Sequence, residues 1–136
     1  MESIEAFLDR VRQAWDTGDS DGFAREFAED ATYVVFRGDV LLGREEIRSA
    51  HAELFSKWQK NTRLRFKLLH IHHLSEVAVC VVTIGGIGKD SHIPYDKFQT
   101  YTLIRTGQDT WQCIAFQNTE MSSRSRDLYN LDQPNL

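Results

Sequence analysis

The sequence has little of several residue types, and each shortage excludes a class of protein. Its 136 residues include only two cysteines and two prolines. Two cysteines are too few for a disulfide-stapled miniprotein, and 41% hydrophobic with 26% charged residues is typical neither of a disordered chain nor of collagen. No apolar run approaches the roughly 20 residues that a membrane-spanning helix needs. The length therefore predicts one globular domain with a single hydrophobic core.

The chain also lacks an excess of positive charge. It has 16 Lys and Arg against 20 Asp and Glu, so the net charge is −4, which disfavours non-specific binding to nucleic acid or to anionic membranes. The first ten residues contain Glu2, Glu5 and Asp9 and show no basic or apolar segment of a secretory signal peptide. We therefore expect a cytoplasmic protein that has neither nucleic acid nor membrane as a partner.

The two cysteines lie far apart, and each sits inside an apolar run. Cys80 is flanked by valines and Cys113 by Trp111 and Ile114. No basic residue lies beside either thiol to lower its pKa. We interpret both as small buried hydrophobic side chains in a reducing compartment.

The first half of the chain has the period of helices. Apolar residues at helical spacing form one stripe, namely Ile4, Phe7, Leu8, Val11 and Trp15. Gly18 ends this predicted helix in the left-handed conformation. A short second helix after Asp19 or Ser20 would bury Phe23 and Phe27. A strand over residues 32–36, a turn and a strand over residues 40–42 come next.

A third helix is predicted from Arg44 to Trp58. One face of it carries Ile47, His51, Leu54, Phe55 and Trp58. This face would pack on a sheet, which directs the imidazole of His51 inward.

The second half has the period of strands, over residues 63–72, 76–84, 97–105 and 110–118. In the first of these, Leu64, Phe66, Leu68 and His70 would face one way and Arg63, Arg65 and Lys67 the other, as an outer basic row. Residues 85–94 would form a flexible, glycine-rich connection that could cover the mouth of a cavity. Four strands joined in succession predict an antiparallel meander with helices on one face, which is an α+β fold. We place the domain at residues 1–121 and a polar C-terminal tail at 122–136. That tail is either loose or docked on its own or a partner subunit.

Four segments occur in a characteristic order: Trp15–Asp19, Phe27–Ala31, Gly43–Ile47 and Trp111–Thr119. In this set the chain resembles the nuclear transport factor 2-like superfamily. The ending Ala115–Thr119, together with His51, resembles the SgcJ/EcaC branch of its SnoaL-like proteins. The resemblance covers about residues 3–119. It implies a cone-shaped domain, in which a strongly curved antiparallel sheet wraps around about three N-terminal helices and leaves an apolar cavity. It also implies a homodimer that forms through the sheet.

The superfamily includes isomerases, dehydratases, polyketide cyclases and association modules, so the fold does not settle the function. Steroid isomerases of this group use a tyrosine on the first helix and an aspartate base on the first strand. Alignment puts Val11 and Val35 at these positions, and neither residue can transfer a proton. The resemblance therefore excludes isomerase chemistry of that form.

The candidate ligand-pocket residues come from the helical stripe and from the strands. They are Tyr33, His51, Phe55, Trp58, Gln99, Tyr101, Gln117 and Asn118. His51 is the candidate catalytic residue, because an inward imidazole can serve as a general acid or base near neutral pH; the alternative is a hydrogen-bonded core histidine.

The two amides Gln117 and Asn118 are adjacent and point to opposite faces of a strand, so only one of them can line the cavity directly. An amide can donate to and accept from a ligand carbonyl or hydroxyl. We likewise expect only one of Gln99 and Tyr101 to face inward. Asp30 is interpreted as a turn or capping carboxylate that precedes the strand rather than as a base.

His70 and His72 share strand spacing that could place two imidazoles on one metal ion, with His92 or Glu76 as a third ligand. No spacing typical of a metal motif supports this reading, so we expect no metal and no other cofactor.

The sequence leaves two classes of function open. In the first, an apolar cavity binds a hydrophobic or polyketide-like small molecule, either without chemistry or as a cofactor-free isomerase, dehydratase or cyclase. In the second, the domain is a non-catalytic dimerisation or association module.

Overall fold

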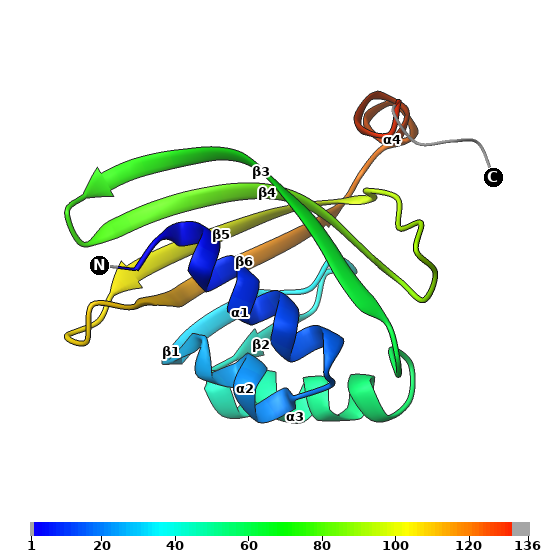
Figure 1. The fold of residues 1–136 in the computed structure, drawn as a ribbon. Helices are drawn as coiled ribbons and strands as arrows, with labels where there is room; N and C mark the ends of the chain where they lie inside the picture. Colours follow the sequence, from blue (N-terminus) through cyan, green and yellow to red (C-terminus); the bar gives the residue numbers. More distant parts are fainter. Residues whose placement is uncertain (1, 132–136) are drawn as a thin grey trace.

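The computed structural model describes residues 2–131 (Figure 1). Its helices are α1 (Ile4–Asp16), α2 (Ser20–Arg25), α3 (Arg44–Ser56) and α4 (Ser123–Tyr129). Its strands are β1 (Phe27–Val34), β2 (Val40–Leu42), β3 (Arg63–Ser75), β4 (Ala78–Gly88), β5 (Lys97–Arg105) and β6 (Trp111–Glu120). None of the helices in this part of the chain combines the length and the apolarity of a membrane span.

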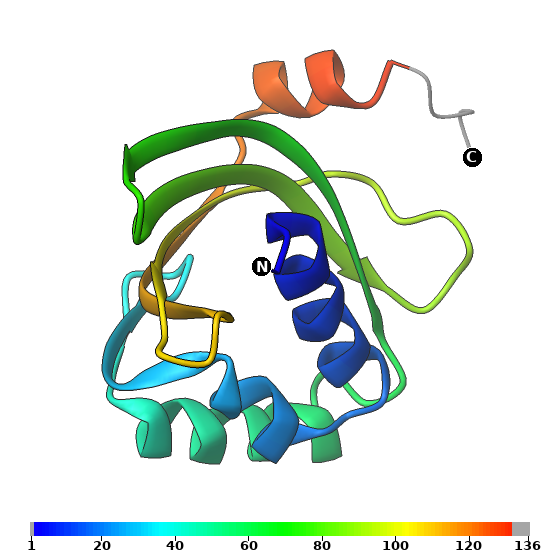
Figure 2. The same ribbon diagram turned by 60° about the vertical axis from the view of Figure 1, so that its left-hand side comes forward.

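One six-stranded sheet runs in the order β2-β1-β6-β5-β4-β3. β3 to β6 form the predicted antiparallel meander, whereas β1 lies parallel to β6. The sheet curves strongly around α1, and α2 and α3 lie below its concave side (Figures 1 and 2). The α+β fold expected from the sequence, with a strongly curved sheet around N-terminal helices, is thereby confirmed, with one parallel strand pair added.

The ends of α1 follow from its sequence. The hydroxyl of Ser3 accepts a hydrogen bond from the backbone N–H of Ala6, which satisfies one of the free donors of the first turn. At the other end Gly18 has φ +67°, and the backbone N–H of Asp19 reaches back to the carbonyl of Ala14. This is the Schellman arrangement that a left-handed glycine makes possible.

The region after α2 differs from the prediction. α2 ends at Arg25, so Phe27 is the first residue of β1 rather than a buried residue of the helix. β1 also begins five residues earlier than expected, because Phe27 pairs with Cys113 of β6. Asp30 therefore lies within β1 as an exposed strand residue and does not precede the strand.

β3 contains an irregularity at the point where its apolar positions shift by one residue, between Leu68 and Ile71. Leu68 pairs with Thr83 and His70 with Val82, so one residue is inserted between them. A bulge of this kind reverses the faces that follow it. Ile71, not His70, packs on the core, and His70 is exposed on the outer face.

The glycine-rich segment also differs from the prediction, because residues 85–88 belong to β4 rather than to a flexible connection. The loop that follows folds back over the outer side of the sheet. A Cβ on Gly86 would lie 2.1 Å from the carbonyl oxygen of Pro94, so the loop backbone uses the space that a glycine leaves. Arg65 stacks on Tyr95 and donates to the carbonyl of Ile93, which fixes the loop on that side.

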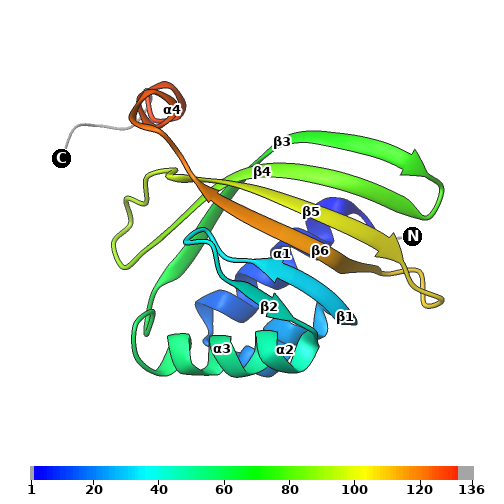
Figure 3. The same ribbon diagram turned by 180° about the vertical axis from the view of Figure 1, so that it is seen from behind.

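The C-terminal segment docks on its own chain as a short helix. α4 lies on the side of the sheet opposite α1 (Figures 1 and 3). Its Tyr129 ring meets Phe98 edge to face, and Asn130 bonds both the N–H and the carbonyl of Tyr95 at 2.8 Å. Met121 completes a small buried cluster beneath it. Of the predicted tail, residues 132–136 lie outside the described part.

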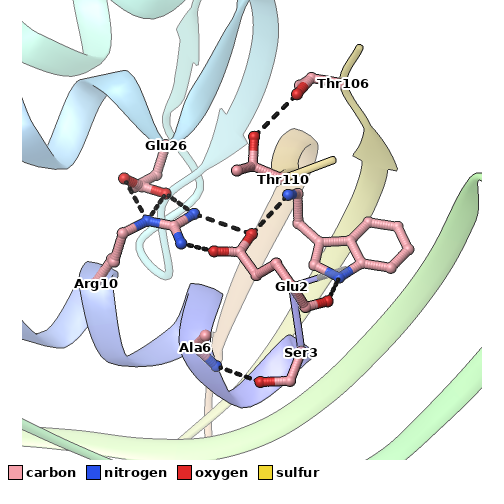
Figure 4. Close-up of polar contacts among 8 residues, drawn as sticks. Glu2, Ser3, Ala6, Arg10, Glu26, Thr106 and Thr110 are labelled. Atoms are coloured by element: carbon pink, nitrogen blue, oxygen red, sulfur yellow. Dashed lines mark hydrogen bonds and ion pairs between the residues drawn. The ribbon is translucent and has the colours of Figure 1, made fainter. Parts of the chain in front are cut away.

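A polar clamp ties the start of α1 to the sheet (Figure 4). Arg10 forms an ion pair with Glu2 and a two-pronged contact with Glu26. The Glu2 carboxylate accepts from the backbone N–H of Trp111 at 2.7 Å, and the Trp111 indole donates to the backbone carbonyl of Glu2. The helix is therefore held at a fixed distance inside the curve.

Candidate functional site

The candidate site centres on a hydrogen-bonded pair, Tyr33 of β1 and His51 of α3. The His51 Nδ1 lies 2.7 Å from the carbonyl oxygen of Ile47, one helical turn before it. A carbonyl can only accept, so Nδ1 carries the proton of the neutral ring and Nε2 is the acceptor. The Tyr33 hydroxyl, 3.3 Å from Nε2, therefore donates to His51.

Aromatic side chains enclose the imidazole. The ring of Phe23 stacks on it with centroids 4.2 Å apart, and three other rings meet it at steep angles, those of Trp15, Tyr33 and Phe55. His51 is only 2% exposed. The prediction that its helical stripe faces inward is thus confirmed, and the ring lies among aromatic residues of α1, α2, α3 and β1.

Burial keeps the titratable groups of this interior uncharged. It lowers the pKa of His51 to about 4, against the opposing effect of the Ile47 carbonyl. Burial also raises the pKa values of Tyr33 and Tyr101 well above that of free tyrosine. At neutral pH both phenols and the imidazole are therefore neutral hydrogen-bonding groups.

A polar row crosses the inner face of the sheet next to the aromatic interior. Gln99 and Tyr101 lie two residues apart and both face inward, so the expectation that only one of them could do so is wrong. Asn118 pairs directly with Gln99, whereas its neighbour Gln117 is exposed on the outer face. This agrees with the expectation that at most one of the two adjacent amides faces inward.

Two predicted residues at the end of α3 lie in different surroundings. Phe55 is buried against Trp15, with ring centroids 5.0 Å apart. Trp58 is 75% exposed, because α3 ends at Ser56 and the helical stripe does not continue to it. Trp58 therefore does not line the interior.

Sequence reasoning did not identify Thr83, the third member of the polar row. Its hydroxyl donates to the Gln99 side-chain oxygen at 2.8 Å, and the residue is fully buried. The register of β4 against β5, in which Thr83 opposes Gln99, is the signal that could have found it. Gly85 lies beside this pair, and a Cβ there would come within 2.5 Å of the same Gln99 oxygen.

The histidines and cysteines outside this interior do not form a second centre. His70 and His72 lie together on the outer face of β3 with ring centroids 4.3 Å apart. Among residues 2–131, no three His, Cys, Asp or Glu side chains are arranged to hold a metal ion. Cys113 is a buried thiol whose pKa burial raises to about 12, and Cys80 is half-buried; both are free.

An open groove of about 500 Å³ lies away from this interior, between α2, α3 and β1. Its lining is Asp21, Ala24, Arg25, Glu29, Arg44, Glu45 and Arg48. Its acidic and basic side chains are equal in number; Arg48 pairs with Glu45, and Arg44 donates to the carbonyl of Phe27. None of the predicted site residues contributes to this groove.

The SnoaL-like domain family model matches residues 4–111, and the chain belongs to that family. No curated protein matches the chain. Among solved structures, a domain with a cystatin-like fold from Nostoc punctiforme is 25% identical, with a TM-score of 0.80 over 95% of this chain and 82% of that chain.

Two other similar structures extend the comparison. An NTF-2 like protein from Shewanella oneidensis is 20% identical, with a TM-score of 0.74, and the match covers 86% of this chain and 96% of that one. A ketosteroid isomerase-like protein from Erwinia carotovora is 12% identical, with a TM-score of 0.67 over 88% and 94% of the two chains. These likenesses establish the nuclear transport factor 2-like fold, and they assign no activity to this chain.

Proposed function

We propose that this SnoaL-like domain binds a neutral, largely apolar small molecule against the inner face of its curved sheet. The state of His51 carries the proposal. Its Nδ1 proton is bound to the Ile47 carbonyl and its Nε2 is occupied by the Tyr33 hydroxyl. Within residues 2–131 the hydrogen-bond and ring partners of this pair include no carboxylate. Because both ring nitrogens are engaged within the protein, the imidazole is not free to take up a proton from a ligand, so binding is favoured over acid–base catalysis.

The alternative within this function is cofactor-free isomerisation, dehydration or cyclisation, with His51 as the catalytic residue. The low pKa of His51 opposes a role as a base of useful strength at neutral pH. The ketosteroid isomerase-like relative adds no support for that chemistry here, because Val11 and Val35 occupy the expected positions of the tyrosine and the base.

The proposal also includes a branch of the family and a class of ligand. The segment Ala115–Thr119, which resembles the SgcJ/EcaC branch, forms the end of β6 and places Asn118 on the inner face. We propose membership of that branch, with a polyketide-like molecule as the ligand class and the cytoplasm as the location.

Native mass spectrometry of the purified protein tests the binding function. We expect a co-purifying species with the mass of a small organic molecule, lost from His51→Ala and retained by His72→Ala, whose imidazole is exposed on the outer face. A protein of clean mass that also retains no apolar probe in equilibrium dialysis contradicts the proposal.

A second candidate, a homodimeric association module, is favoured by the outer face of the central strands. Five outward positions of these strands are half-buried and uncharged, although a quarter of the chain is charged: Cys80, Val82, Thr100, Thr102 and Ala115. We propose that two copies pair through this face. Thr102→Arg would place a charge in its centre and should give a monomer in sedimentation velocity, whereas Ser49→Arg on exposed α3 should not. An unchanged sedimentation coefficient for Thr102→Arg contradicts this pairing.

A further inference from the structure

The polar row on the inner face of the sheet contains hydrogen-bonding groups that have no partner within the row. Thr83, Gln99 and Asn118 occupy register-matched positions on three adjacent strands, and the apolar Leu68 continues the line on β3. None of these residues is charged. A ligand that settles on this row therefore meets hydroxyl and amide groups and no countercharge.

The Gln99 end of the row is fixed in orientation. Because the Thr83 hydroxyl donates to the Gln99 side-chain oxygen, the NH₂ group of that amide is the end that remains to donate. No protein partner of this NH₂ group is seen among residues 2–131. Gly85 makes the arrangement possible, since any larger residue would displace the Gln99 amide.

The Asn118 end of the row lacks a partner. Its side-chain oxygen is buried and makes no hydrogen bond within the described chain. Leaving such an acceptor unpaired is unfavourable, so a donor supplied from outside the chain would be bound preferentially. Asn118 as a residue is half-buried, but this oxygen itself is covered, so a ligand that bonds to it must displace the side chains that now cover it.

We infer that the ligand carries a neutral hydroxyl group, which donates to Asn118 and accepts from Gln99. A hydroxyl group is the simplest group that satisfies both amides at once. The apolar remainder would lie on Phe66, Leu68 and Val35, which pack on the core and are only partly buried. This inference rests on the proposed binding function and makes Gln99 and Asn118 its specificity-determining residues.

Equilibrium dialysis against three matched probes tests the inference: 2-naphthol, 2-methoxynaphthalene and naphthalene. The wild-type protein should bind 2-naphthol about fivefold more tightly than 2-methoxynaphthalene, which lacks only the donor, as one added hydrogen bond implies. The preference over naphthalene, which lacks both the donor and the acceptor, should be larger. Asn118→Leu should abolish the preference over 2-methoxynaphthalene while binding of naphthalene persists. Gly85→Ala should weaken the preference over naphthalene by displacing the Gln99 amide, without altering Asn118 itself.

Gln117→Leu is the matched control, because it removes the adjacent amide from the outer face. It should leave the preference for 2-naphthol intact. Equal binding of all three probes by the wild type, or a preference that survives both Asn118→Leu and Gly85→Ala, overturns the inference and leaves the binding function standing. Retention of none of the probes overturns both.

Discussion

Acid should destabilise this protein through His51 in particular. The imidazole is neutral in the folded state, where burial lowers its pKa to about 4, and it titrates near 6.5 in the unfolded chain. Between these values the unfolded state binds the proton and the folded state does not. The free energy of unfolding therefore falls as the pH drops from 6.5 to 4, and it is unaffected by this residue above and below that window.

The size of the effect follows from the two pKa values. Between pH 7 and pH 4.5 the linkage relation gives a loss of about 2.5 kcal/mol from His51 alone. Replacement by phenylalanine removes the titrating group and keeps an aromatic ring against Phe23 and Trp15. We expect His51→Phe to cost about 1–3 kcal/mol at pH 7, because the Tyr33 hydroxyl loses its acceptor.

Urea unfolding followed by tryptophan fluorescence measures both quantities, and Trp15 lies 6.0 Å from the imidazole as a local reporter. Between pH 7 and pH 4.5 the variant should lose about 2.5 kcal/mol less than the wild type. His72→Phe, which removes an exposed imidazole, should retain the wild-type pH dependence. Identical pH dependences for wild type and His51→Phe would refute the neutral, buried state assigned to this residue.

Two further changes test the parts of the fold that surround the site. Gly86→Ala should destabilise the protein by about 1–3 kcal/mol in thermal unfolding, since its Cβ would collide with the Pro94 carbonyl. Gly107→Ala is the control, because a Cβ there meets no atom within 4 Å, and it should change stability by less. Equal losses in the two variants would contradict the close approach at Gly86. Asn130→Ala should speed hydrogen exchange of the Tyr95 amide, whose side-chain acceptor it removes, and unchanged exchange would show that α4 does not fasten the loop.

Much of the fold could be predicted because the spacing of hydrophobic residues distinguishes helices from strands along the chain. The helical stripe of α1, the capping role of Gly18 and the four-strand meander all follow from spacing and turn chemistry. The bulge at Leu68 was missed because the alternation was continued to His70, although the apolar positions shift by one residue between Leu68 and Ile71. The early start of β1 at Phe27 could not be predicted from the local sequence, since it depends on pairing with β6, more than 80 residues away.

Only part of the site could be predicted, because many of its contacts join elements that are far apart in the sequence. The inward direction of His51 follows from its own helix, but the rings that enclose it come from three other elements. Thr83 has no local feature that distinguishes it from other strand threonines, and its importance depends on lying opposite Gln99. Trp58 was misplaced because periodicity does not show where the last turn of a helix ends.

The clamp between Glu2 and Trp111 has a consequence for how the chain is made. The two residues are 109 positions apart, and a ribosome adding about 5–20 residues per second needs on the order of 5–20 s to supply the second after the first. During that interval Arg10 has Glu26 as an early partner, and the apolar stripe of α1 is covered only in part, first by α2 and then by β3. The attachment of the first helix is therefore completed only when β6 has been made.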